Sequence, residues 1–212
     1  MRASRPLHSR TPPRAVPTRG FTLIELMVTL AVAAIMIGIA VPSFQSVVNS
    51  NKLASAANEM VASLQLARME AVRRNARAAV CASATANAGA GATCASAAIN
   101  GWITFVDENG NGDFDSASDT LLRNSLLEAP MELSFSANFN TDVDASVVFR
   151  PDGWAREDDD GIGGNLFDGV IRFCLPVGRP RDNARDLEIE SGSRVVVLDR
   201  DNDACAVPGD PA

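Results

Sequence analysis

The chain has 212 residues and a formal net charge of −7, from 19 basic and 26 acidic residues. Its only histidine is His8, so the rest of the chain cannot build a Ser-His-Asp or Cys-His catalytic site and lacks the commonest zinc ligand. We therefore expect a protein that is not an enzyme. From residue 78 onward nine arginines face 23 acidic residues, which disfavours general affinity for nucleic acid.

Residues 1–20 contain five arginines, four prolines and no acid, a composition typical of an unstructured leader that is removed. Residues 21–41, FTLIELMVTLAVAAIMIGIAV, are long enough to cross a bilayer as a helix. The flanking arginines predict that the N-terminal end stays on the cytoplasmic side. Glu25 is the only charge in this run. Because an unpaired carboxylate in lipid costs several kcal/mol, Glu25 is expected to be functional.

The apolar run leads into a second helical stretch, residues 42–77, in which apolar residues recur at steps of three and four. This pattern predicts one long helix over residues 22–76, apolar all round in its first half and amphipathic in its second. Pro42 removes a backbone donor, so a kink or a locally meltable segment is expected there.

Beyond residue 77 the pattern changes to short strands separated by turn residues. One long helix followed by mostly antiparallel strands predicts an α+β fold, with residues 78–212 as a single β-rich head. The expected strands are 78–83, 102–106, 120–127, 131–136, 147–150, 167–175, 187–190 and 194–198.

The four cysteines, Cys81, Cys94, Cys174 and Cys205, are widely spaced and suit disulfides in an oxidising compartment. Three connectivities are possible, and we favour Cys81–Cys94 with Cys174–Cys205, because each pair brackets a short loop or hairpin-like segment. The alternative is four buried free thiols in a cytosolic protein.

The loop that begins at Asp107 carries oxygen side chains at alternate positions and a glycine at the sixth, as in the first half of an EF-hand calcium loop. Ser118 stands where the bidentate glutamate is expected, so a hairpin loop without metal is the alternative. The acidic run 157–160 is expected to be a solvated loop, with cation binding as its alternative. The candidate calcium ligands are Asp107, Asn109, Asn111, Asp113 and Asp115.

Taken together, these features resemble the type IV pilin-like proteins, and within them the GspH/FimT family of minor pilins and pseudopilins. The resemblance is carried by GFTLIEL (20–26), Pro42, LQLARMEAVRRN (64–75), GWITFVDENGNGD (101–113) and RPDGW (150–154).

The resemblance implies that a prepilin peptidase cuts between Gly20 and Phe21 and methylates the new Phe21 amine. It also implies that Glu25 pairs with the N-terminal amine of a neighbouring subunit, with Pro42 as a second assembly residue. The expected product is a single-pass inner-membrane protein with a periplasmic head and no cofactor other than the calcium considered above.

Three functions stay open at this stage. The favoured one is a minor pilin or pseudopilin, assembled with other pilins into a type II secretion pseudopilus or a type IV pilus. A DNA-binding minor pilin is the alternative, because Gly178-Arg179-Pro180-Arg181 matches a Gly-Arg-x-Arg motif of family members concerned with DNA uptake. The third is an ordinary exported protein with a mature N-terminus near Ala34. The candidate DNA-binding residues are Arg179, Arg181, Arg185 and Arg194.

Overall fold

The structure is a computed structural model that describes residues 20–139, 145–156, 165–201 and 204–211. The chain divides into two compact units, residues 1–42 and residues 43–212. One helix, α1 (Leu23–Arg74), runs through the end of the first unit into the second and continues through Pro42. The single long helix expected over residues 22–76 is therefore confirmed.

In the first unit, the side chains of α1 from Leu23 to Val41 are all exposed. Among the described residues, α1 is the one helix that is long and apolar enough to span a membrane, and none of its most apolar stretch is buried in the protein. A helix that exposes apolar side chains on every face requires an apolar environment, which a bilayer or neighbouring helices provide.

In the second unit, α1 is amphipathic and packs one face on the strands. Small residues recur on that face, which lets the helix approach the sheets closely. The buried positions at helical spacing are Leu53, Ala57, Met60, Leu64, Ala67 and Ala71.

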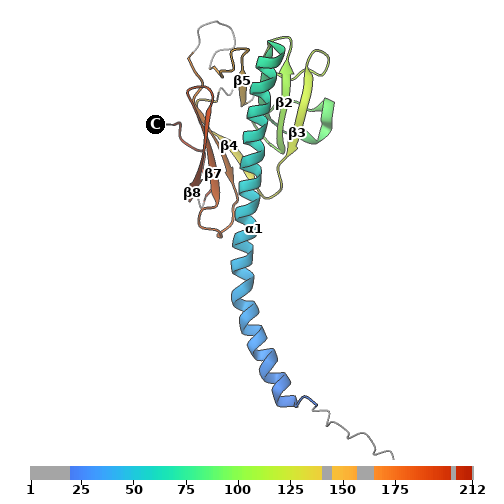
Figure 1. The fold of residues 1–212 in the computed structure, drawn as a ribbon, viewed down its shortest axis with the longest axis vertical. Coiled ribbons are helices and arrows are strands. Elements are labelled where there is room, and N and C mark those ends of the chain that lie inside the picture. Colours follow the sequence, from blue (N-terminus) through green and yellow to red (C-terminus); the bar gives the residue numbers. More distant parts are fainter. Residues whose placement is uncertain (1–19, 140–144, 157–164, 202–203, 212) are drawn as a thin grey trace, which may run out of the picture. The chain divides into compact units, whose positions relative to one another are not determined.

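The strands form two four-stranded antiparallel sheets (Figure 1). The first has the order β3-β2-β1-β5, with β1 (Arg77–Ser83), β2 (Gly101–Asp107), β3 (Thr120–Leu126) and β5 (Ser146–Phe149). The second has the order β4-β6-β7-β8, with β4 (Glu132–Phe135), β6 (Gly169–Cys174), β7 (Ala184–Glu190) and β8 (Arg194–Arg200). A 3₁₀ segment, η1 (Ala86–Gly91), lies between β1 and β2 in the chain.

Every expected strand is present, so the α+β prediction is confirmed. The largest difference is in β7, which begins at Ala184 instead of residue 187. The missed residues include Arg185 and Asp186, whose charges hide the strand pattern although both side chains are buried.

The main core lies between α1 and the two sheets. Trp102 of β2 packs edge-on against Phe173 of β6, with ring centroids 5.6 Å apart, so the two sheets share this core. The indole Nε1 of Trp102 donates a hydrogen bond to Ser63 Oγ of α1 at 3.0 Å. A buried Trp N–H needs such a partner, and this one ties the first sheet to the helix.

A smaller core covers the opposite face of the first sheet, where Phe105 packs against Phe114 at 5.3 Å between centroids. Because both faces of β2 are covered, all seven of its residues are buried. This explains why GWITFVD reads as a nearly continuous apolar run rather than an alternating one.

Both favoured disulfides are formed. Cys81 of β1 bonds Cys94, and Cys174 of β6 bonds Cys205 in the C-terminal segment, with S–S distances of 2.04 and 1.96 Å. No free cysteine remains among the described residues, so the four-thiol alternative is wrong.

Candidate processing and assembly site

The junction between Gly20 and Phe21 lies just ahead of α1 and is open to its surroundings. Phe21 is 80% exposed, and a Cβ added at Gly20 would meet no atom within 4 Å. A protease that must grip the backbone closely gains from a residue without a side chain at this point. The leader expected at residues 1–20 lies outside the described residues, except for Gly20.

Thr22 caps the first turn of α1, a role that the sequence analysis missed. Its Oγ1 accepts a hydrogen bond from the backbone N–H of Glu25 at 3.2 Å. A threonine followed three residues later by a glutamate is the pattern of a capping box, so the signal was present in the sequence. The cap fixes where the helix begins relative to the Gly20–Phe21 junction.

Glu25 lies in that first turn, exposed, where the positive end of the helix dipole favours a negative charge. Within the part of the chain that the structure describes, no basic group forms an ion pair with it. A carboxylate in this position is available to a cation supplied from outside the chain, and a neighbouring N-terminal amine has the right charge.

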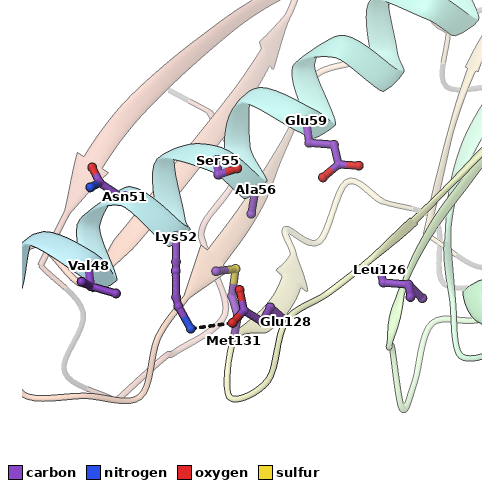
Figure 2. A pocket seen from close by; sticks show the side chains of 9 residues that line it. All are labelled: Val48, Asn51, Lys52, Ser55, Ala56, Glu59, Leu126, Glu128 and Met131. Carbon is purple, nitrogen blue, oxygen red and sulfur yellow. Dashed lines mark hydrogen bonds and ion pairs between the residues drawn. The ribbon is translucent and has the colours of Figure 1, made fainter. Parts of the chain in front are cut away.

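A groove of about 380 Å³ runs between the second-unit part of α1 and the β3–β4 connection (Figure 2). Its three charged groups, on Lys52, Glu59 and Glu128, all have partners. Lys52 Nζ lies 2.6 Å from Glu128 Oε1, and Glu59 accepts hydrogen bonds from Arg123 at 3.0 Å and Ser125 at 2.6 Å. These contacts fasten α1 to β3 and to the β3–β4 connection.

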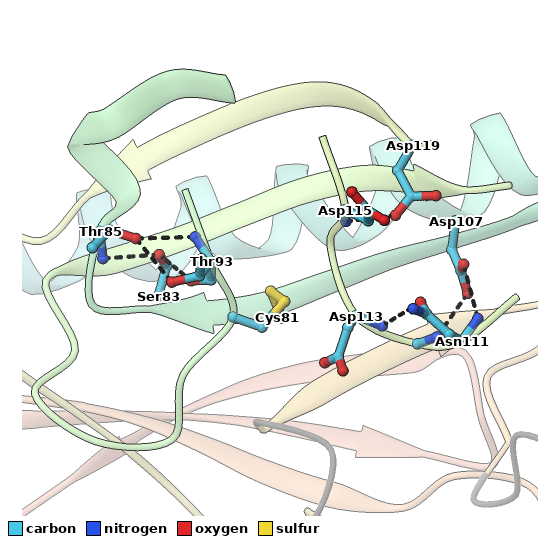
Figure 3. The surroundings of a disulfide bond; sticks show 11 residues. Cys81, Ser83, Thr85, Thr93, Asp107, Asn111, Asp113, Asp115 and Asp119 are labelled. Atoms are coloured by element: carbon cyan, nitrogen blue, oxygen red, sulfur yellow. Dashed lines mark hydrogen bonds between the residues drawn. A yellow bond between two sulfur atoms is a disulfide. The ribbon is translucent and has the colours of Figure 1, made fainter. Parts of the chain in front are cut away.

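The candidate calcium loop is organised by Asp107, whose side chain is buried (2% exposed). Its carboxylate accepts backbone hydrogen bonds from Gly110 at 2.7 Å, Asn111 at 3.2 Å and Gly112 at 3.0 Å, some of which Figure 3 shows. Gly110 and Gly112 have φ of 76° and 81°, a conformation that favours glycine. The backbone donors therefore hold the turn through the carboxylate that would be the first calcium ligand.

The other candidate ligands take part in similar turns. The side chain of Asn109 accepts from the N–H of Asn111, and Asn111 accepts from the N–H of Asp113, both at 3.0 Å. Asp115 accepts from Ala117 at 3.0 Å. Across residues 20–139, 145–156, 165–201 and 204–211, no group of three His, Cys, Asp or Glu side chains is arranged to hold a metal ion. These turns favour the hairpin loop without metal, and a calcium titration tests the alternative. The acidic run 157–160 lies outside the described residues.

Three of the four candidate DNA-binding arginines form ion pairs. Arg181 Nε lies 2.9 Å from Asp201 Oδ2, and Arg194 Nη1 lies 3.4 Å from Glu190 Oε2. Arg185 is buried and lies 2.8 Å from Asp199 Oδ1. Arg179 is exposed in the loop before β7, and its backbone carbonyl accepts a hydrogen bond from Asn49 of α1.

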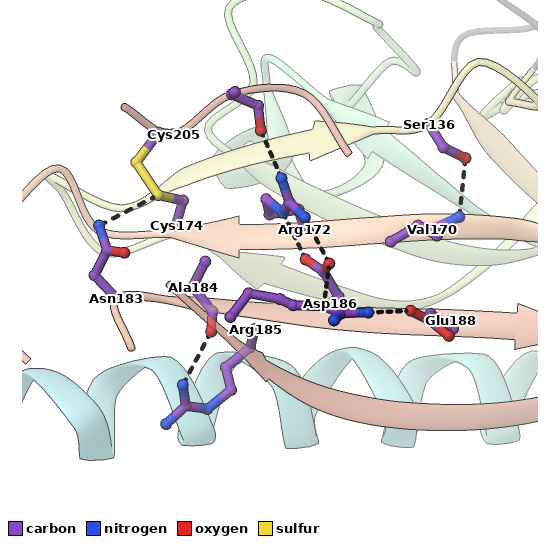
Figure 4. A network of polar contacts seen from close by, with 12 residues as sticks. Ser136, Val170, Arg172, Cys174, Asn183, Ala184, Arg185, Asp186, Glu188 and Cys205 are labelled. Atoms are coloured by element: carbon purple, nitrogen blue, oxygen red, sulfur yellow. Dashed lines mark hydrogen bonds and ion pairs between the residues drawn. A yellow bond between two sulfur atoms is a disulfide. The ribbon is translucent and has the colours of Figure 1, made fainter. Parts of the chain in front are cut away.

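A buried ion-pair network stabilises the second sheet and the C-terminal segment (Figure 4). The Arg172 guanidinium donates two 2.6 Å hydrogen bonds to the Asp186 carboxylate, whose side chain is 3% exposed, and a third to the carbonyl of Ala206 at 2.9 Å. Arg200 adds a contact to Asp186 at 3.3 Å. Bidentate pairing of this kind fixes the geometry of the two side chains, and removal of either partner would leave a buried charge unpaired.

The fold and the N-terminal site define a class of protein: a subunit with an apolar N-terminal helix, a processing junction before it and a β-rich head after it. Comparison with known proteins agrees. The family described as "Type II transport protein GspH" matches residues 56–201, and the "Prokaryotic N-terminal methylation motif" matches residues 17–41. The chain belongs to the GspH family of pilin-like proteins, which are structural subunits rather than enzymes.

The chain is also similar to the pilin-like protein PilA1 of Thermus thermophilus, at 32% identity over 103 residues. This alignment covers 48% of the chain and 56% of PilA1, so the chain spans about half the length of that relative. No solved structure shows a significant match to the chain. The methylation motif together with the apolar helix indicates a membrane-anchored minor pilin or pseudopilin with a C-terminal head.

Proposed function

We propose that a prepilin peptidase cuts this chain between Gly20 and Phe21, that the Phe21 amine is methylated, and that the product assembles with other pilins into a filament. The observation that carries the proposal is the part of α1 that lies in the first unit. Its apolar side chains are exposed on every face, and its one charged residue is Glu25, four residues after Phe21. An isolated protein gains nothing from this arrangement, whereas a bilayer and then a bundle of helices cover it.

In this proposal Glu25 pairs with the Phe21 amine of a neighbouring subunit. The cut creates that amine, so the cation does not exist before processing. In an apolar surrounding, a carboxylate and an amine attract each other strongly, and each is costly when left unpaired. The pair therefore favours processed subunits in the correct register.

The proposed location is the inner membrane, with the head in the periplasm. The two disulfides suit an oxidising compartment, and the arginine-rich segment before α1 suits a cytoplasmic N-terminus. The match to the GspH family supports a role in type II secretion, and the similarity to PilA1 supports a pilus. Service in DNA uptake is not proposed, because the chain from residue 78 onward is strongly acidic and repels a polyanion.

The experiment expresses Glu25→Gln in the native host and measures the protein in membranes and in filaments sheared from cells. Glu132→Gln is the matched control, because Glu132 is exposed on β4 and forms no ion pair among the described residues. We expect Glu25→Gln to reach the membrane at the wild-type level and to fall roughly tenfold or more in filaments, since the pair is lost. Equal incorporation of both variants would contradict the role of Glu25 in assembly.

A further inference from the structure

Each sheet ends in two edge strands, and three of the four edges are protected. In β3, Leu122 is an extra residue, because Thr104 pairs with Arg123 while Phe105 pairs with Leu121. Such a bulge interrupts an edge. The strands β4 and β5 have four residues each, and Ala155 returns to bridge Phe149 at the end of β5. Short, bulged or covered edges are the usual means by which proteins prevent unwanted strand pairing.

The fourth edge, β8, has none of these protections. It pairs with β7 over seven residues in unbroken register, from Arg194 opposite Glu190 to Arg200 opposite Ala184. Its sequence, RVVVLDR, contains no proline, glycine or lysine, and its charged residues, Arg194, Asp199 and Arg200, stand toward its ends. In Figure 1 β8 lies at the border of its sheet, and within the described ranges no strand pairs with its far side. Val197, in its centre, is 41% exposed.

The side chains of β8 indicate the chemistry of a strand that would fit there. Alternate residues share a face, so Arg194 and Arg200 lie at the two ends of a face whose centre is Val196 and Leu198. Their side chains are 74% and 46% exposed although both contact carboxylates of β7. On β7 those contacts come from acidic residues that alternate with Leu187 and Ile189.

We propose that the free edge of β8 docks an extended segment of another protein that has apolar residues at its centre and carboxylates at its ends. Backbone hydrogen bonds would supply affinity, and the two arginines would select the acidic ends. A second β8 is not the occupant, because symmetric pairing about Val197 would place Arg194 opposite Arg200. The inference rests on residues of the second unit alone and does not depend on the cut before Phe21 or on Glu25, so it goes beyond the proposed function.

The test uses the full chain in detergent micelles and a fluorescently labelled peptide, Glu-Thr-Val-Thr-Val-Thr-Glu, followed by fluorescence anisotropy. In this peptide the glutamates and the valines share one face. We expect saturable binding that Val197→Lys weakens by at least about tenfold, because an edge lysine opposes strand pairing. Leu126→Lys is the matched control: it places the same charge at a 58% exposed position on the bulged β3 edge and should leave binding unchanged.

Two further arms use wild-type protein and so do not depend on the folding of a variant. The same peptide methylated at alternate backbone nitrogens should not bind, since it cannot complete the ladder, and a peptide with lysines in place of the glutamates should bind more weakly. Equal binding of the methylated and unmethylated peptides, or wild-type affinity in Val197→Lys, would overturn the proposal. Glu25→Gln should retain peptide binding, which separates this result from that of the filament experiment.

Discussion

At the residue scale, Asp107 shows how one buried carboxylate can shape a loop that resembles a metal site. It accepts three backbone hydrogen bonds from residues 110–112, so the turn is complete without a cation. We expect Asp107→Asn to destabilise the protein by about 1–3 kcal/mol. The amide has one acceptor oxygen instead of two, so a buried backbone N–H would lose its partner. Chemical denaturation would measure it.

The same loop gives the calcium test. Since backbone donors already hold the turn at Asp107 and no three His, Cys, Asp or Glu side chains of the described residues are arranged around a cation, we expect the melting temperature of the wild type to be the same in excess calcium and in excess chelator. A ligand that binds only the folded state raises the melting temperature. A clear rise in calcium, lost in Asp107→Asn, would show that the loop is a calcium site after all.

Glu70, near the end of α1, supplies a pH-dependent contribution. Hydrogen bonds from Arg73 and then Arg74 lower the pKa of its carboxyl from the usual 4.5 to about 2. A lowered folded-state pKa means that the ionised group stabilises the fold above pH 4.5 and that this contribution is lost as the pH falls toward 2. Denaturation midpoints of wild type and Glu70→Gln should therefore differ at neutral pH and converge in acid. A difference that does not depend on pH would contradict this origin.

At the scale of the elements, most of the fold could be predicted, because the spacing of apolar residues along the chain indicates which side chains are buried. The apolar residues of α1 that recur at steps of three and four form its buried face. Turn-forming residues mark the boundaries of the eight strands in the described part of the chain. The start of β7 was missed for a physical reason: Arg185 and Asp186 are charged but buried by partners from elsewhere in the chain, and no local pattern reveals such partners. The helix cap at Thr22 was visible in the sequence and overlooked.

The candidate functional residues could be predicted only in part, because some of them depend on neighbours in the sequence and others on partners far away in it. The processing junction and Glu25 form a continuous motif, so the sequence contains all of their context. The candidate DNA-binding arginines depend on neighbours distant in sequence: Arg181 pairs with Asp201, and Arg185 with Asp199. Spacing alone could not show that these guanidinium groups are engaged.

The C-terminal segment depends on the disulfide between Cys174 and Cys205, which closes a loop with a sequence separation of 31. Replacing both cysteines by serine should cost about 3–4 kcal/mol, from the loop-closure entropy returned to the unfolded chain. The double serine variant of Cys81 and Cys94, with a separation of 13, should lose slightly less. Denaturation under non-reducing conditions checks both, and an unchanged stability in the first variant would contradict the expectation.

At the scale of the whole molecule, the charges are unevenly distributed: 23 of the 26 acidic residues lie from residue 78 onward, whereas residues 1–20 carry five arginines and no acid. Because such a surface repels a polyanion, we expect no shift of duplex DNA by the detergent-solubilised protein, even at low salt. Binding at low salt that Arg179→Ala abolishes would instead support a DNA-binding minor pilin.

The central claim is that α1 becomes a filament-forming helix through a cut made before it rather than after it. Mass spectrometry of the N-terminal peptide of the protein purified from membranes tests this most directly. We predict a chain that begins at N-methylated Phe21. A mature N-terminus near Ala34, or an intact leader in the accumulated protein, would contradict it.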